Sequence, residues 1–359
     1  MTHSAPWLNE TMRRIETDYN RSADTHLIFH HVPGCADVDL YFKDESTHPS
    51  GSLKHRLARS LFLYGVCNGK INEGTTIIES SSGSTAVSEA YFAQFLGLPF
   101  IAVVPEKTAP AKLEKIKFYG GTCHLVDPSD IYSDAHRLAQ ELDGYYMDQF
   151  TNAERATDWR SNNNIADSIF EQMSAEQHPV PRWVIASAGT GGTSATIGRY
   201  MRFHSRQYCQ TNLCVADPEF SVFYDYFQTG DAALTSNRGS RIEGIGRPRV
   251  EPSFIREVID RMERVPDAAS IAAIHFLEKV MGRKCGASTG TNFYATLKIM
   301  CEMKTAHEKG SVVTMICDSG ARYMDTYYND DWIAEQGFDL APYLQQIEQA
   351  YRYGVWEDF

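Results

Sequence analysis

The sequence has few features of a secreted, metal-binding or membrane protein. Its eight cysteines include no CxxC pair, and several lie in apolar runs such as 315–317, which is typical of buried thiols in a reducing compartment. His30, His31 and His124 lack the Cys, His or Asp spacing of a metal site, so no metal is expected. Apolar runs such as 61–64 are too short to span a bilayer, and no apolar signal segment follows Met1. We therefore expect a cytoplasmic protein without a membrane span.

The sequence also lacks a basic region. It has 34 Lys and Arg against 46 Asp and Glu, a formal net charge of −12, and no block of five or six like charges. This balance disfavours nucleic-acid and anionic-membrane partners and leaves a small-molecule substrate as the expected partner. With 359 residues, of which 43% are hydrophobic and 22% charged, the chain is long enough for two globular domains.

Strand-like and helix-like segments alternate from about residue 75, which predicts an α/β fold. Such alternation implies right-handed crossovers and two mostly parallel, twisted sheets flanked by helices. Ligands in these folds bind beyond the carboxyl ends of the strands. The region 218–249 shows no clear period and is expected to be a long ordered loop. The expected strands are 75–78, 98–104, 122–126, 183–187, 213–216 and 311–317, and the expected helices are 85–96, 110–119, 131–142, 156–173, 267–281 and 290–303.

A glycine loop, Gly189-Thr190-Gly191-Gly192-Thr193, lies between an expected strand and an expected helix. Consecutive backbone N–H groups at a helix N-terminus suit a phosphate dianion, although a tight turn that needs glycine only for packing has the same pattern. No GK[ST] follows, and Ser194 takes the place of the third glycine of GxGxxG. An NAD-dependent oxidoreductase is therefore only a remote alternative.

Three further segments carry candidate chemistry. Lys54 follows a Pro/Ser/Gly turn, and nearby positive charge and desolvation could lower the pKa of its amine enough for covalent catalysis, whereas by itself it resembles a solvated surface lysine. The hydroxyl-rich segment 81–85 could bind a substrate carboxylate or simply cap a helix. Ser319, in Asp318-Ser319-Gly320, follows an apolar strand and by itself indicates only a turn.

Together these segments resemble, in order and spacing, the PLP-dependent cysteine synthase and cystathionine β-synthase family over nearly all of residues 20–335. Within that family the chain is most similar to the bacterial L-cysteine desulfhydrases. The segments that carry the similarity are SGSLKHRLAR at 50–59, SSGSTAVSEA at 81–90 and RIEGIGRPR at 241–249. The resemblance implies PLP fold type II, as in the tryptophan synthase β-subunit, and a homodimer.

The resemblance also implies a division of the chain into two domains. The smaller, at 45–155, would carry the loop for the substrate carboxylate. The larger, at 1–44 and 156–359, would carry the phosphate loop and the contact to the cofactor ring.

Site residues follow from the resemblance position by position. Lys54 would be the catalytic residue and would bind pyridoxal 5′-phosphate as a Schiff base, and Ser319 would contact the pyridine nitrogen. Ser84 stands where synthases of this family usually have Asn. The cofactor-binding residues would be Lys54, Ser84, Gly189, Thr190, Gly191, Gly192, Thr193 and Ser319. The substrate-binding residues would be Ser81, Ser82, Gly83, Thr85, Gln149 and Gly244.

The expected reaction is β-elimination on L-cysteine, giving hydrogen sulfide, pyruvate and ammonia. A neutral Ser319 at the pyridine nitrogen would not favour full ring protonation, which suits elimination better than transamination or racemisation. The departure at Ser84 from the synthase pattern points the same way. The alternative is O-acetylserine-dependent cysteine synthesis by β-replacement, which the physical chemistry of the sequence does not separate from elimination.

Overall fold

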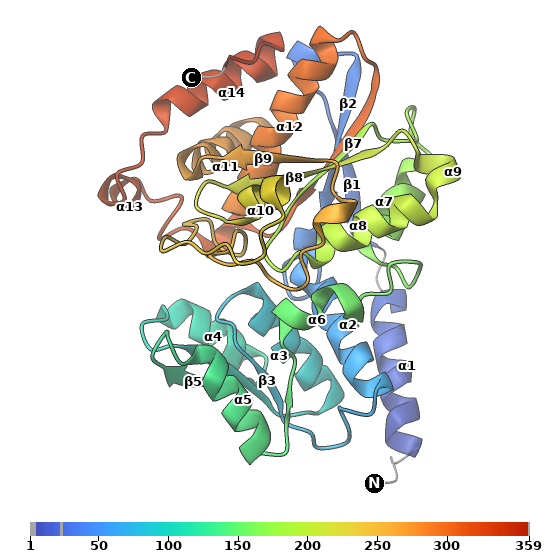
Figure 1. The fold of residues 1–359 in the computed structure, drawn as a ribbon, viewed down its shortest axis with the longest axis vertical. Helices are drawn as coiled ribbons and strands as arrows, with labels where there is room; N and C mark the ends of the chain where they lie inside the picture. The colour runs from blue at the N-terminus through green and yellow to red at the C-terminus, as the bar shows by residue number, and fades with distance from the viewer. Residues whose placement is uncertain (1–4, 22–23, 358–359) are drawn as a thin grey trace. The chain divides into compact units, whose positions relative to one another are not determined.

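The computed structural model describes residues 5–21 and 24–357, and the chain forms two compact units. The smaller unit contains the described residues up to Asp24 together with His48–Asp158, and the larger contains Thr25–Thr47 and the residues from Trp159 onward. Each unit has its own sheet (Figure 1). Within the described ranges, no helix combines the length and apolar character that crossing a membrane requires.

The smaller unit is built on a four-stranded sheet of order β5-β4-β3-β6, and all its pairings are parallel. Its strands are β3 Ile77–Glu79, β4 Phe100–Pro105, β5 Thr122–Val126 and β6 Tyr145–Tyr146. Its helices are α1 Ala5–Arg21, α2 Lys54–Cys67, α3 Ser84–Leu96, α4 Pro110–Phe118, α5 Ile131–Glu141 and α6 Gln149–Ala156.

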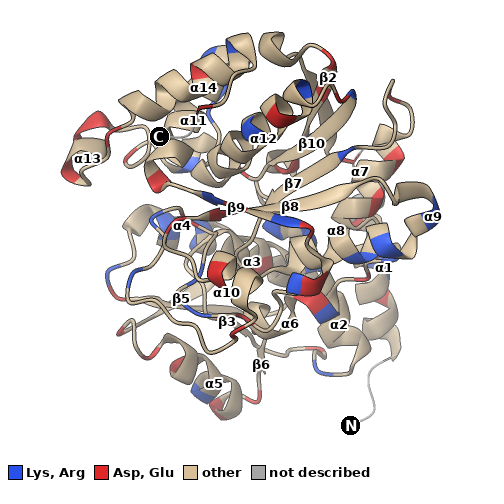
Figure 2. Ribbon diagram, turned by 45° about the horizontal axis from the view of Figure 1, so that its top comes forward, with Lys and Arg blue, Asp and Glu red and all other residues tan. Residues whose placement is uncertain are grey.

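Local sequence explains where these helices lie and end. Helix α3 is buried along most of its length and stops at Gly97, whose φ of 74° is the left-handed conformation that glycine adopts most readily. Helix α5 instead has a solvent face on which Arg137 pairs with Asp134 and Glu141, so both signs of charge appear on it in Figure 2. Thus α3 forms part of the core of the unit and α5 covers its surface.

The larger unit is built on a six-stranded sheet of order β1-β2-β10-β7-β8-β9. Only the β1–β2 pair is antiparallel. Its strands are β1 His26–His30, β2 Val38–Asp44, β7 Trp183–Ser187, β8 Asn212–Pro218, β9 Arg261–Val265 and β10 Gly310–Ile316. Its α-helices are α7 Ile165–Met173, α8 Gly192–Phe203, α9 Ser205–Tyr208, α10 Phe223–Thr229, α11 Asp267–Met281, α12 Ala287–Thr305, α13 Asp330–Glu335 and α14 Ala341–Tyr353.

The α/β class and the parallel character of both sheets are confirmed, but several element bounds are corrected. Of the helix predicted at 156–173, only 165–173 is helical and forms α7, because α6 already ends at Ala156 and a turn separates the two helices. Asn162 and Asn163 adopt positive φ, and the side chain of Asn164 caps α7 by accepting hydrogen bonds from the N–H groups of Ala166 and Asp167. Asparagine tolerates both roles, which is why the helical pattern is interrupted there. The predicted loop 218–249 contains α10.

The N-terminal bounds of the units also differ from the prediction. Residues 1–44 were expected in the larger domain, yet α1 belongs to the smaller unit. Ile15 is buried in the core formed with α2 and α3, and the guanidinium of Arg14 donates to the carbonyl oxygen of Phe95 at 3.0 Å. An amphipathic helix carries no signal for which of two cores it will cover, so only tertiary packing could place α1.

Candidate functional site

In the smaller unit, two predicted substrate-binding segments meet at one edge of the sheet. Strands β3 and β6 are parallel neighbours, so the loop after β3 and the start of α6 both lie beyond their carboxyl ends. There the hydroxyl of Thr85 donates to Oε1 of Gln149 at 2.7 Å, and both side chains are buried. This bond leaves the side-chain NH₂ of Gln149 as the group that can donate to a carboxylate.

The loop itself presents backbone donors. Helix α3 begins at Ser84, and its N-cap residue Gly83 is extended and offers no capping side chain. Ser81 accepts a hydrogen bond from the N–H of Gly83 at 3.2 Å, and Ser81, Ser82, Gly83 and Ser84 are all half-buried. A helix N-terminus without a side-chain cap attracts an anion, so the geometry suits the carboxylate predicted there.

Lys54 opens helix α2 and is half-buried. The turn before it is fixed by Gly51, whose φ of +79° favours glycine, and by Ser52, whose hydroxyl accepts from the N–H of Lys54 at 3.3 Å. The same turn is joined to α3, because the hydroxyls of Ser50 and Ser88 lie 2.8 Å apart. The structure therefore fixes the backbone of Lys54 relative to the helix that follows the carboxylate loop.

A buried hydrogen-bond chain continues from this turn. Nε2 of His55 lies 3.3 Å from Asp18, and its Nδ1 lies 3.0 Å from the hydroxyl of Ser50. A neutral ring that donates to Asp18 from Nε2 must accept from Ser50 at Nδ1, so Ser50 in turn accepts from Ser88. Burial lowers the pKa of His55 to about 4, although the hydrogen bond to Asp18 opposes this shift. This series of hydrogen bonds therefore anchors the turn before Lys54 through a neutral histidine.

This depressed pKa predicts a stability loss in acid. The unfolded chain takes up the His55 proton below about pH 6.5, whereas the folded protein resists protonation until about pH 4. The free energy of unfolding should therefore fall as the pH drops from 6.5 to 4, by at most roughly 3 kcal/mol from this group. Urea unfolding of the wild type and of His55→Gln across this range measures the effect. Gln does not titrate, so equal slopes for both proteins would contradict the prediction.

In the larger unit, the predicted phosphate loop runs from the end of β7 into α8. Gly191 is the N-cap of α8 with φ +91°, and the helix has no side-chain cap. The hydroxyl of Thr190 accepts from the N–H of Gly192 at 3.2 Å. Gly189 has no space for a side chain, because an added Cβ would lie 2.2 Å from the carbonyl oxygen of Gly244. The structure thus brings Gly244 against the phosphate loop, and the N–H of Gly246 donates to Ala188 at 2.8 Å.

Ser319 lies at the same edge of this sheet. Strands β10 and β7 are parallel neighbours, so the segments that follow them leave the sheet side by side. The hydroxyl of Ser319 accepts from the N–H of Ala321 at 3.3 Å, which leaves its own hydrogen for an acceptor such as a pyridine nitrogen. Next to it, Asp318 is held by the hydroxyl of Tyr323 at 2.6 Å.

These residues fit pyridoxal phosphate. Within the larger unit, the N-terminus of α8 offers a glycine-lined loop and a helix dipole that suit a phosphate, and Ser319 offers a hydroxyl that suits a ring nitrogen. Within the smaller unit, Lys54 offers a primary amine that suits a Schiff base. Among the residues the structure describes, no three His, Cys, Asp or Glu side chains gather where they could hold a metal ion.

Two buried acids next to the carboxylate loop were not in the predicted set. Glu79 is the last residue of β3, and Glu89 lies within α3; both side chains are fully buried. A glutamate that ends the apolar strand Ile77-Ile78, and another inside a helix of small and apolar residues, are the signals that could have identified them.

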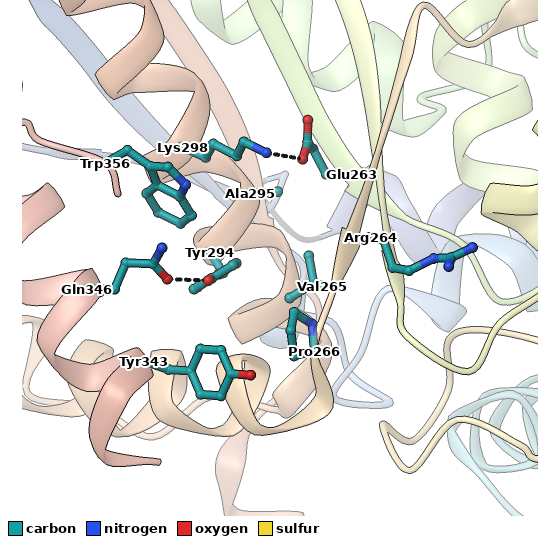
Figure 3. A pocket seen from close by; sticks show the side chains of 10 residues that line it. All are labelled: Glu263, Arg264, Val265, Pro266, Tyr294, Ala295, Lys298, Tyr343, Gln346 and Trp356. Atoms are coloured by element: carbon teal, nitrogen blue, oxygen red, sulfur yellow. Dashed lines mark hydrogen bonds and ion pairs between the residues drawn. The ribbon is translucent and has the colours of Figure 1, made fainter. Parts of the chain in front are cut away.

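None of the predicted site residues lines a cavity of about 270 Å³ in the larger unit (Figure 3). Tyr294, Tyr343 and Trp356 line it, and Lys298 pairs there with Glu263 at 2.9 Å. The hydroxyl of Tyr294 donates to Gln346 of α14. The cavity is thus built from β9, α12 and the C-terminal segment.

Comparisons with known proteins agree with this geometry. Residues 24–318 match the family described as pyridoxal-phosphate dependent enzymes. The chain is 57% identical over 343 residues to L-cysteine desulfhydrase Cds1 of Mycobacterium tuberculosis, covering 94% of this chain and 92% of that protein.

Two solved structures share the fold. O-ureido-L-serine synthase aligns with a TM-score of 0.73 at 23% identity, covering 86% of this chain and 96% of that one. The O-acetylserine dependent cystathionine β-synthase of Helicobacter pylori aligns with a TM-score of 0.72 at 26% identity, covering 87% and 97%. The fold type II architecture expected from the sequence is thereby confirmed, and the chain belongs to the family of pyridoxal-phosphate dependent enzymes.

Proposed function

We propose that this chain converts L-cysteine and water into hydrogen sulfide, pyruvate and ammonia. The observation that carries the proposal is the 57% identity, over 94% of the chain, to a protein named L-cysteine desulfhydrase. The contacts within each unit support it, because the uncapped start of α3 suits a carboxylate in the smaller unit and the glycine loop at the start of α8 suits a phosphate in the larger.

The two units have different tasks in this proposal. The smaller unit binds the substrate carboxylate through 81–85 and Gln149, and the larger binds the cofactor phosphate through 189–193 and the ring nitrogen through Ser319. Lys54 and Ser84 of the smaller unit are cofactor-binding residues in this proposal. When bound, pyridoxal phosphate supplies an electron sink for the electrons released at the substrate α-carbon.

Lys54 is the proton-transfer group of the reaction. Its amine takes the α-proton of the substrate. Binding of the substrate carboxylate orients that proton toward the amine. Backbone N–H groups at the start of α3 and the NH₂ of Gln149 fix that carboxylate. Ser319 is neutral, so its hydroxyl can donate a hydrogen bond to the ring nitrogen without fully protonating it. Prompt departure of the sulfur group is therefore favoured over transamination.

An assay with purified enzyme separates elimination from replacement. With L-cysteine alone, we expect sulfide and pyruvate in equal amounts. With O-acetylserine plus sulfide, we expect little net cysteine. Abundant cysteine in the second assay without pyruvate in the first would identify the enzyme as a cysteine synthase instead.

We also propose that the enzyme works in the cytoplasm as a homodimer. The homodimer follows from the family resemblance. All eight cysteines are free thiols, and five of them are buried, which suits a reducing compartment. Light scattering of the purified holoenzyme would test the homodimer by giving a mass of twice 40.4 kDa.

A further inference from the structure

Glu79 connects the two sides of the proposed carboxylate subsite. Its Oε1 accepts the N–H of Ser80 at 2.7 Å and the hydroxyl of Ser80 at 3.2 Å. Its Oε2 accepts the N–H of Gln149 at 3.2 Å. One buried carboxyl group therefore binds both the residue that opens the loop and the residue that opens α6.

The other side of the subsite closes the ring. The side chain of Gln149 accepts from Thr85 at the far end of the same loop. The loop 80–85 is thus held at its first residue by Glu79 and at its last residue by Gln149, whose own backbone is held by Glu79. Moving Glu79 would change the spacing of the groups proposed to bind the carboxylate.

Glu89, on α3, is a second fully buried acid of this unit. Within the described part of the chain, no N–H or O–H donor reaches either oxygen of Glu89, and the carboxyl of Glu79 is one of its polar neighbours. Two carboxyl groups attract each other only when one is protonated and donates. Burial and the charge of Glu79 raise the pKa of Glu89 well above its usual range, so Glu89 is the one that carries the proton.

The surroundings of Glu79 shift its pKa as well. Burial raises its pKa to about 7, the N–H donors of Ser80 and Gln149 oppose this shift, and the nearby carboxylate of Asp148 adds to it. Tyr146, whose hydroxyl lies 2.6 Å from that of Ser80, also faces this group. Above neutral pH, Glu79 is therefore the anion that accepts these hydrogen bonds.

We propose that Glu79 and Glu89 are positioning residues for the substrate carboxylate, with Glu89 donating a hydrogen bond to Glu79 and Glu79 holding Ser80 and Gln149 in place. This inference rests on the proposed function of the loop 81–85. Burying two acids costs stability that an apolar pair would not, so their presence fits a role in fixing local geometry.

The test measures ligand binding to the holoenzyme by calorimetry at pH 8. The probes are L-alanine, which has the substrate carboxylate but no leaving group, and ethylamine, which is the same molecule without the carboxylate. Glu79→Gln replaces an acceptor oxygen by a donor, and Glu89→Leu removes the donor to Glu79. Glu89→Gln keeps a donor, and Glu106→Gln changes an exposed acid that follows the neighbouring strand β4.

We expect L-alanine to bind about tenfold more weakly to Glu79→Gln and Glu89→Leu than to the wild type, because a buried N–H loses its acceptor or that acceptor is displaced. Ethylamine affinity should be unchanged in both. Glu89→Gln and Glu106→Gln should bind both probes as the wild type does. A general loss of packing would not explain normal L-alanine affinity with Gln at position 89 together with weakened affinity with Leu there.

Other results would overturn the inference. The first is that the wild type binds L-alanine more tightly than ethylamine and that Glu79→Gln and Glu89→Leu show the same preference. Another is equal weakening of both probes. If Glu79→Gln does not fold, as judged by thermal unfolding and cofactor absorbance, the pair Glu89→Leu and Glu89→Gln decides alone. A wild type that does not distinguish the two probes would instead refute the proposed carboxylate subsite, and the inference with it.

Discussion

Lys54→Ala is expected to abolish both the colour and the activity of the holoenzyme. The wild type should absorb visible light through its bound cofactor, and borohydride should bleach that absorption and leave the cofactor attached to Lys54. Without the amine, the covalent link and the base for the α-proton are both lost. Sulfide production from L-cysteine should fall by at least about 10³-fold.

A matched control is available for this substitution. Lys70 is an exposed lysine of the same unit, and Lys70→Ala should keep the colour and the rate. Mass spectrometry of a borohydride-treated digest should locate the cofactor on the peptide that contains Lys54. A wild type that stays colourless when pyridoxal phosphate is added would refute the assignment, and so would a Lys54→Ala variant that retains full activity.

Gly191→Ala is expected to disrupt the phosphate loop. Gly191 has φ +91°, and an added Cβ would lie 2.5 Å from Cα of Phe254 and 2.6 Å from the carbonyl oxygen of Ser253. Both are backbone atoms, and Phe254 is held by its ring, which stacks on Phe223 at 4.1 Å. Since that backbone cannot easily yield, the loop must move. We expect at least about tenfold weaker cofactor binding and a stability loss of about 3 kcal/mol or more.

Gly282→Ala separates backbone strain from the clash. Gly282 has φ +70°, but nothing lies within 4 Å of the Cβ it would gain. This control should therefore lose only about 1–2 kcal/mol of stability and bind the cofactor normally. Cofactor titration by fluorescence, with urea unfolding of both variants, measures the difference. Normal cofactor affinity in Gly191→Ala would show that this loop does not hold the phosphate.

Hydrophobic pattern and glycine placement were enough to predict the fold class. The alternation of apolar strands and helices after residue 75 determines parallel sheets, since each helix must return the chain to the same end of the sheet. The loops at 81–85 and 189–193 were predicted for the same reason, because each follows a strand and opens a helix. The role of Lys54 was different: its neighbours alone describe a surface lysine, and only the family resemblance predicted its chemistry.

Some parts of the chain have no signal of this kind. The pattern of α1 shows that it is amphipathic but does not show which core it covers, and the structure places it on α2 and α3. The turn at 162–164 depends on positive φ at two asparagines, which helical periodicity does not show.

Sequence by itself determined the architecture, the family and the segments that carry chemistry, because periodicity, turn residues and motif spacing are properties of neighbouring residues. Tertiary structure alone decided which distant groups touch. Ser50 meets Ser88, Thr85 meets Gln149, and Glu79 binds the backbone of Gln149, 70 residues away. Burial also shifted the pKa values of Glu79, Glu89 and His55. In water at neutral pH the two glutamates would be ionised, and His55 would titrate near its usual pKa. Desolvation depends on the whole surrounding fold, and no local segment encodes it.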